Sequence, residues 1–98
     1  TFGELKIDFA HRQVMVGDRE VKLTPIEYDI LKQLALHAGK VLTHRQLLKS
    51  IWGTEYQEEN HYLRVYIGQL RRKIEPDLNR PKYIITETGV GYRLMIKE

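Results

Sequence analysis

Two helix-capping motifs in the first half of the chain constrain the fold more than any other feature. Residues 24–27 read Thr-Pro-Ile-Glu, and residues 43–46 read Thr-His-Arg-Gln. In each motif a threonine hydroxyl, with a Glu or Gln three residues later, satisfies the free backbone amides of a helix start. An apolar stripe at helical spacing follows each motif, and a glycine suited to a helix end comes next, Gly39 and Gly53 respectively. The sequence therefore predicts two short helices in succession.

Apolar residues at every second position predict strands before these helices. Three short runs of this kind precede the first motif: Leu5, Ile7 and Phe9, then Val14 and Val16, then Val21 and Leu23. Gly17 and Asp18 fit the turn of a hairpin. We therefore expect an N-terminal antiparallel sheet of about three or four strands.

The second half of the chain predicts a third helix and a hairpin. Residues 54–58 are polar and indicate a connecting loop. A helix should then run from about residue 59 to residue 75, where Pro76 follows. Residues 83–86 form one expected strand, and Tyr92, Leu94 and Ile96 alternate along the return strand. In the turn at 87–91, two glycines (Gly89 and Gly91) permit positive φ. The predicted fold class is α+β, with an N-terminal antiparallel sheet, three helices and a C-terminal β-hairpin.

The third expected helix has one apolar face and one face suited to a polyanion. At about 100° per residue, its inward stripe consists of Leu63, Ile67, Leu70 and Ile74. The opposite face carries His61, Val65, Gly68, Gln69 and Arg72, flanked by Arg64 and Arg71 on one side and by Tyr62, Tyr66 and Lys73 on the other. Residues 61–73 contain no Asp or Glu. Arginine binds phosphate or guanine, glutamine pairs with adenine, and aliphatic groups contact the thymine methyl, so this face predicts a contact with double-stranded DNA.

Each of these features alone has an ordinary alternative. A basic helix is equally consistent with a solvated face, and the hairpin with simple closure of a sheet. Their succession favours a helix and a hairpin, the wing at residues 86–93, that contact DNA together. Gly68 has two interpretations of equal weight: close approach of the backbone to DNA or a neighbouring element, or a tolerated surface glycine.

The charge distribution and the lack of cysteine argue against several other functions. Residues 61–98 carry eight Lys and Arg against four Asp and Glu, whereas residues 1–60 carry eight against nine, so a polyanion should bind the second half. The absence of cysteine excludes disulfides, thiolate nucleophiles and Cys-based zinc sites. The four histidines show no metal-binding spacing, and no apolar run has the length of a membrane span. We expect no enzyme, no catalytic or metal site, no cofactor and no membrane partner, and a cytoplasmic location.

Four segments are similar to those of one family: LTPIEY at 23–28, VLTHRQLL at 41–48, VYI with LRRK at 65–67 and 70–73, and GVGYR at 89–93. On these segments, and over nearly its whole length, the chain resembles the C-terminal effector domain of OmpR/PhoB-type bacterial response regulators. The resemblance implies one winged helix-turn-helix domain over residues 1–98, with a receiver domain before it in the full-length protein. Residues 61–66 and 86–89 are most similar to the potassium-transport regulators of that family.

The resemblance also implies a binding mode, with the 59–75 helix in the major groove and the 86–93 hairpin at the minor groove. The implied contacts from the helix are His61, Arg64, Val65, Tyr66, Gln69, Arg71, Arg72 and Lys73, with Gln69 at a base-reading position. Implied phosphate contacts near the second helix are Thr43, Arg45 and Trp52, and those of the wing are Thr88, Gly89 and Arg93. Gly68 and Thr88 stand where relatives carry arginine, which puts one phosphate contact and deep insertion of the wing in doubt.

The implied role is transcription regulation in a two-component system, with activation of potassium-transport genes. The implied partners are RNA polymerase at loop 53–58, a second copy of the full-length protein on directly repeated half-sites, and a sensor histidine kinase that acts through the receiver domain. A rival interpretation is a winged helix that binds protein and has lost the basic face. The acid-free 61–73 stretch argues against that rival, and steep salt dependence of binding would separate the two.

Overall fold

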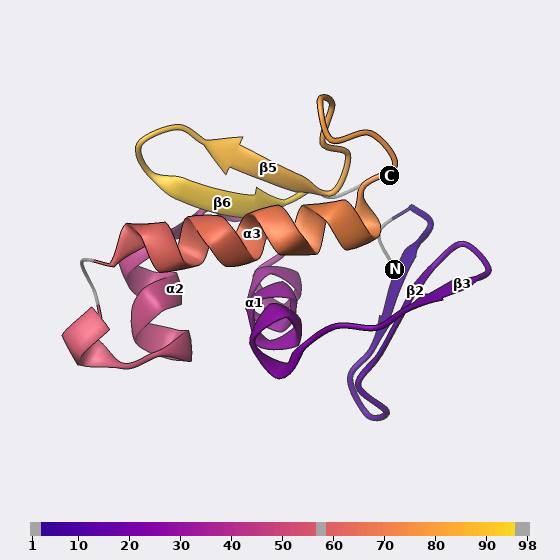
Figure 1. Ribbon diagram of the computed structural model, residues 1–98, viewed down its shortest axis with the longest axis horizontal. Helices are drawn as coiled ribbons and strands as arrows, with labels where there is room; N and C mark the ends of the chain where they lie inside the picture. The colour runs from indigo at the N-terminus through magenta and orange to yellow at the C-terminus, as the bar shows by residue number, and fades with distance from the viewer. Residues whose placement is uncertain (1–2, 57–58, 96–98) are drawn as a thin grey trace.

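The structure is a computed structural model that describes residues 3–56 and 59–95. In chain order its elements are β1 (Leu5–Asp8), β2 (Gln13–Val16), β3 (Arg19–Val21), α1 (Pro25–Leu36), β4 (Leu42–Thr43), α2 (His44–Ile51), the 3-10 helix η1 (Thr54–Tyr56), α3 (Asn60–Ile74), β5 (Ile84–Glu87) and β6 (Gly91–Leu94). Helix α3 crosses the middle of the molecule, with α1 and α2 on one side and the β5–β6 hairpin on the other (Figure 1). The predicted α+β class and order of elements are confirmed.

The N-terminal sheet has three antiparallel strands in the order β1-β2-β3. Strands β2 and β3 pair Val16 with Arg19. That register leaves Gly17 and Asp18 as the predicted two-residue turn, and Gly17 has a φ of 60°. A turn that needs positive φ favours glycine, so the hairpin prediction is confirmed.

The prediction that β1 extends to Phe9 is wrong. Strand β1 ends at Asp8, and Phe9 is exposed. The chain turns here because the Asp8 carboxylate binds His11: Oδ1 accepts from the His11 backbone amide at 3.2 Å, and Oδ2 lies 2.9 Å from His11 Nδ1. The side-chain hydrogen bond, followed by the backbone one, lowers the pKa of the Asp8 carboxyl below its usual value.

Both capping motifs begin helices as predicted. At α1, Thr24 Oγ1 accepts from the Glu27 amide at 3.3 Å, and Glu27 Oε1 accepts from the Thr24 amide at 3.0 Å. At α2, Thr43 and Gln46 make the same two bonds at 3.0 and 2.8 Å. The two expected glycines after these helices both have positive φ. Two orphan donors are satisfied at each start, which is why a local motif sufficed to predict both helices.

Two predictions for connecting segments are wrong. Residues 54–56 form the 3-10 helix η1 rather than open loop, and residues 57–58 lie outside the described residues. Gly89 has the expected positive φ of 76°, but Gly91 does not share it. A Cβ on Gly91 would instead collide with the Leu42 carbonyl, because β4 packs there. The missing side chain admits β4 to a second sheet, in the order β4-β6-β5, which the sequence did not indicate.

The hairpin β5–β6 is present as predicted, but β6 ends at Leu94, and Met95 already lies outside the strand. Strand β5 begins at Ile84 instead of residue 83, and Ile96 lies outside the described residues. The strands pair Ile84 with Leu94 and Thr86 with Tyr92. The side chain of Tyr92 therefore comes from the middle of the wing, and it is buried.

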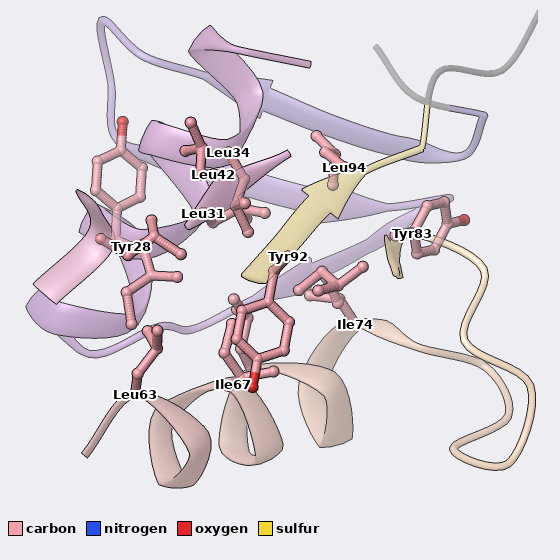
Figure 2. Close-up of a cluster of buried hydrophobic side chains, with 14 of the residues drawn as sticks. Tyr28, Leu31, Leu34, Leu42, Leu63, Ile67, Ile74, Tyr83, Tyr92 and Leu94 are labelled. Atoms are coloured by element: carbon pink, nitrogen blue, oxygen red, sulfur yellow. The ribbon is translucent and has the colours of Figure 1, made fainter. Parts of the chain in front are cut away.

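The core lies between α3, α1 and the β6 strand. The predicted inward stripe of α3 is confirmed, since its four members are all buried to 2% exposure or less: Leu63, Ile67, Leu70 and Ile74. In Figure 2, side chains of this stripe point toward Leu31 and Leu34 of α1, and Tyr92 extends from the wing toward α3. This packing fixes which face of α3 points outward. No helix in the described part of the chain is long and apolar enough to cross a membrane.

Candidate nucleic-acid interface

The outward face of α3 carries most of the predicted helix contacts. Four of these side chains are exposed: His61, Arg64, Val65 and Arg72. Gln69 and Gly68 are half-buried on the same face. Val65, at 54% exposure, is an aliphatic side chain without a place in the core. The face therefore presents cations, an aliphatic group and an amide to solvent over two to three helical turns.

The whole of α3 lacks acidic residues, since Asn60–Ile74 reads NHYLRVYIGQLRRKI. Glu59 occupies the N-cap position without a side-chain capping bond, and its carboxylate lies 3.5 Å from the ring of His61. Glu75 follows at the other end. The acids thus stand at the two ends, and the positive charge between them is not compensated along the helix itself.

Gly68 has no structural reason to be glycine within the described part of the chain. A Cβ placed on it would meet no atom within 4 Å. Glycine inside a helix costs about 1 kcal/mol relative to alanine. Of its earlier interpretations, close approach to a neighbouring element is excluded. Approach of an external partner, or simple tolerance, remains.

The N-terminal half of α3 is held by aromatic packing. The Trp52 ring, at the end of α2, lies 5.5 Å from the Tyr66 ring and 6.1 Å from the Tyr62 ring, measured between centroids. Tyr62 also contacts Tyr56 of η1 at 6.1 Å and His61 at 4.4 Å. Two predicted DNA contacts, Trp52 and Tyr66, are therefore half-buried members of a cluster that joins α2, η1 and α3.

Arg71 points to the wing rather than to the outward face. Its Nη2 donates to the Ile84 carbonyl at 2.9 Å and to Thr86 Oγ1 at 2.6 Å. Its guanidinium carbon lies 5.8 Å from the centre of the Tyr92 ring. Its Nε is buried and has no hydrogen-bond partner. The contact with DNA predicted for Arg71 stays a prediction, and the partners seen here belong to β5 and β6.

Lys73 joins α3 to α1. Its Nζ lies 2.6 Å from Oε1 of Glu27, whose side chain is 1% exposed. The same oxygen accepts from the Thr24 amide in the α1 capping motif. Arg19 of β3 donates to the Lys73 carbonyl at 3.2 Å, which satisfies one of the free carbonyls at the helix end. Lys73 thus has an internal role, and its predicted DNA contact is untested.

Glu75 binds the chain that leads into the wing. Its side chain is buried, and its two carboxylate oxygens accept from the backbone amides of Lys82, Tyr83 and Ile84 at 2.6 to 3.1 Å. Backbone amides aimed at a carboxylate make charge-assisted hydrogen bonds. The start of β5 is therefore tied to the end of α3.

The turn of the wing is exposed at Thr88, Gly89 and Val90. The Val90 carbonyl accepts from the His44 amide at 3.1 Å, so the wing touches the start of α2. Arg93, a predicted wing contact, has its Nε 2.6 Å from Oε2 of Glu87 across the hairpin. Thr88 and Gly89 remain accessible, whereas Arg93 is neutralised by its neighbour.

The start of α2 lies beside the wing. The Thr43 hydroxyl accepts from the Gln46 amide, and its own proton remains available to a further acceptor. Arg45 is exposed in the first turn of α2. In residues 3–56 and 59–95, no group of three or more His, Asp or Glu is placed to hold a metal ion.

The structure adds three residues that the sequence analysis missed. Thr86 and Tyr92 contact the Arg71 guanidinium, and Glu75 accepts hydrogen bonds from the backbone at the start of the wing. Only Glu75 could have been identified from the sequence. An acidic residue at a helix C-terminus is unfavourable with the helix dipole, so its presence there indicates a stabilising contact elsewhere. The partners of Arg71 are far along the chain, and no local pattern indicates them.

The chain matches one family model and is similar to a curated regulatory protein of that family. Residues 18–94 match the family model described as "Transcriptional regulatory protein, C terminal". Over 95 residues the chain is 52% identical to the KDP operon transcriptional regulatory protein KdpE of Escherichia coli K12, which covers 97% of this chain and 42% of that protein. The chain thus spans less than half the length of this relative.

Two solved structures have the same fold. One is the response regulator DrrB of Thermotoga maritima, an OmpR/PhoB homologue, with a TM-score of 0.88 and 39% identity over 97% of this chain and 43% of that one. The other is the DNA-binding domain of Klebsiella pneumoniae RstA in complex with the RstA box, with a TM-score of 0.88 and 36% identity over 97% of this chain and 94% of that one.

Proposed function

The chain belongs to the family of transcriptional regulatory protein C-terminal domains, the winged helix-turn-helix DNA-binding domains of OmpR/PhoB-type response regulators, and on that premise we propose how it binds DNA. This is a family of transcription regulators, not of enzymes. We propose that α3 enters the major groove of a duplex and that the β5–β6 hairpin contacts the adjacent minor groove.

One observation carries this proposal: the acid-free face of α3 is largely exposed, and the β5–β6 hairpin, whose turn is exposed, runs alongside α3 (Figure 1). A major groove about 12 Å wide admits one α-helix. The groove displays hydrogen-bonding groups and thymine methyls at its floor and phosphates at its rims. Along the axis of α3, Val65 and Gln69 lie between Arg64 and Arg72, so the outward face presents an aliphatic group, an amide and two cations together.

The other predicted contacts divide into two roles. We assign phosphate contacts to Arg64, Arg72 and His61, because their side chains are exposed. We assign base contacts to Val65 and Gln69, which lie on the same outward face. The start of α2 supplies further phosphate contacts through Thr43 and Arg45, and the aromatic cluster supplies Trp52 and Tyr66. At the wing, Thr88 and Gly89 approach the minor groove.

The wider role follows from the relatives and is also a proposal. KdpE of E. coli is a regulator of the KDP operon, and we propose that the protein containing this chain activates potassium-transport genes. In the full-length protein a receiver domain would respond to a sensor histidine kinase and promote a homodimer on repeated half-sites. The segment 53–58 would meet RNA polymerase. Such a regulator acts in the cytoplasm, where the DNA is.

Binding of the chain to duplexes selected from a random pool tests the proposal. Selection reports the preferred bases and any half-site repeat together. Affinity measured from about 50 to about 200 mM salt should fall about a hundredfold, because about four phosphate contacts release their counterions. A flat salt dependence, or no binding at low salt, would overturn DNA binding and support a protein partner instead.

The base-reading role of Gln69 has its own test. Gln69→Ala should relax the preference at one base pair of the selected site and leave the salt slope unchanged. The wild-type chain on the same set of single-base variants is the control. A uniform loss across all duplexes would remove Gln69 from base recognition.

A further inference from the structure

The guanidinium of Arg71 in α3 makes hydrogen bonds to the wing. Both acceptors of its Nη2, the Ile84 carbonyl and Thr86 Oγ1, belong to β5. Thr86 pairs directly with Tyr92 of β6, whose ring faces the same guanidinium. One side chain of α3 therefore contacts both strands of the hairpin.

These contacts leave Nη1 as the one guanidinium nitrogen of Arg71 that a phosphate could reach without displacing a contact of the wing. Nη2 is shared by two oxygen acceptors, and Nε is buried. A phosphate would have to displace Thr86 Oγ1 to gain the same donor. The planar guanidinium serves two acceptors in a fixed geometry, which the single ammonium of a lysine does not reproduce.

The wing has anchors at three places along its length. Its base is tied to α3 by Glu75, and its turn is tied to α2 through Val90 and His44. Between them, Arg71 contacts β5 at its first residue, Ile84, which Glu75 also binds, and at its third residue, Thr86. Removal of this contact would let the middle of the hairpin move relative to α3 while both ends stay attached.

We propose that Arg71 is a positioning residue, which with Thr86 sets the angle between the wing and α3 so that one duplex meets both. This inference rests on the proposed DNA binding, in which the two elements occupy neighbouring grooves. Binding groups must be held within about 0.5 Å and about 10–20° of their working geometry. If the angle between the wing and α3 varied, affinity for the selected site would fall, because both elements must fit that site at once. Affinity for unrelated duplexes would not change, because a non-specific complex requires no fixed register.

Substitutions at Thr86 test this without removing a charge. Thr86→Val keeps the shape and the strand propensity but removes the oxygen acceptor, whereas Thr86→Ser keeps the oxygen. We expect T86V to weaken binding to the selected duplex about tenfold, the value of roughly one hydrogen bond to a charged group. We expect unrelated duplexes to be bound as by the wild type, with the same salt slope, and T86S to restore the selected-site affinity.

Arg71→Lys completes the experiment. A phosphate contact tolerates lysine, but the two-acceptor contact does not, so R71K should match T86V in its loss on the selected duplex. The double variant should be no worse than either single variant, because both remove one shared interaction. Amide hydrogen exchange without DNA should show faster exchange in β5 and β6 for R71K and T86V, and not for T86S.

The outcomes separate this inference from the proposed function. If the wild type binds no duplex at low salt, DNA binding and the inference fail together. If the wild type binds and T86V equals T86S in affinity, the positioning role alone is overturned. It is also overturned if T86V lowers the unfolding temperature but keeps the ratio of selected to unrelated affinity, because Arg71 would then serve only stability.

Discussion

The two ends of α3 are held by different kinds of contact. At the C-terminal end, charged side chains make hydrogen bonds and ion pairs: Arg71 binds the wing, Lys73 binds Glu27, and Glu75 binds the backbone at the start of β5. At the N-terminal end, the rings of Trp52 and its tyrosine neighbours pack side by side. The cations that stay exposed, Arg64 and Arg72, stand on the outward face along this length.

This difference means that the number of cations in α3 overstates how many are free of partners within the described part of the fold. Of the four cations in α3, Arg71 and Lys73 are paired within the fold, and in the described part of the chain Arg64 and Arg72 have no such partner. A paired cation still raises the local potential. Direct phosphate contacts, however, should come from the two exposed arginines.

The largest expected effect concerns Glu75. Glu75→Ala leaves three backbone amides at the start of β5 without their acceptor. Because hydrogen bonds to a buried charged group are each worth about 1.5–3 kcal/mol and new solvent contacts replace part of that, we expect the free energy of unfolding to fall by about 3 kcal/mol. Urea unfolding measures it.

Glu75→Gln is the matched control, since it keeps one oxygen acceptor and the size of the side chain. It should destabilise less than Glu75→Ala. Equal losses in the two variants would mean that the negative charge, not the set of acceptors, holds the wing entry. A loss below about 0.5 kcal/mol in both, as for an ordinary surface position, would break the contrast between the two ends of α3.

Two adjacent residues give the sharpest test of that contrast. Lys73→Met and Arg72→Met remove the same charge one position apart. K73M leaves the buried Glu27 carboxylate without its cation and should cost about 1–2 kcal/mol of stability, a value reduced by the partial exposure of Lys73. R72M should leave stability within about 0.5 kcal/mol and weaken binding to all duplexes about tenfold.

For both variants, urea unfolding measures the change in stability and duplex titration measures the change in DNA affinity. K73M should change duplex affinity by less than R72M does, because its ammonium is already paired. If K73M weakens binding as much as R72M, charge alone governs affinity, and the distinction between paired and exposed cations of α3 has no functional meaning.

The sequence was sufficient for features that depend on neighbours a few residues apart. The α1 cap joins Thr24 to Glu27 three residues on, and the α3 stripe follows the helical period. It was insufficient where partners are distant. Lys73 meets Glu27 across 46 positions and Arg71 meets Thr86 across 15. Patterns of charge locate such residues on a helix face, but only packing decides whether that charge is shared with solvent or with another element.

Gly91 illustrates the same limit. The pair Gly89 and Gly91 looked alike in sequence, and both were expected at positive φ. Only Gly89 is there. Gly91 is constrained by the backbone of Leu42 in β4, a two-residue strand too short to produce a pattern of alternating residues.

At the aromatic end of α3, Tyr62→Ala should cost about 1 kcal/mol of stability, because Tyr62 is partly exposed but contacts three rings. Tyr62→Phe keeps the ring and should retain nearly all of the wild-type stability. Thermal unfolding of the two variants gives the comparison. A larger loss in the phenylalanine variant than in the alanine one would show that the ring packing does not hold this end of the helix.

The smallest expected effect concerns the hydroxyl of Tyr66. The ring packs on Trp52 and is half-buried, so Tyr66→Phe should leave the unfolding midpoint unchanged. If the hydroxyl donates to a phosphate, its loss should weaken binding to selected and unrelated duplexes alike by about twofold to threefold, the low end of what a hydrogen bond contributes net of the bond to water that it replaces. Duplex titration at matched salt measures this, with Tyr62→Phe as the control at a neighbouring ring. Unchanged affinity in Tyr66→Phe would mean that the aromatic end of α3, like its C-terminal end, serves the fold alone, and that DNA contacts come from the outward face of the helix.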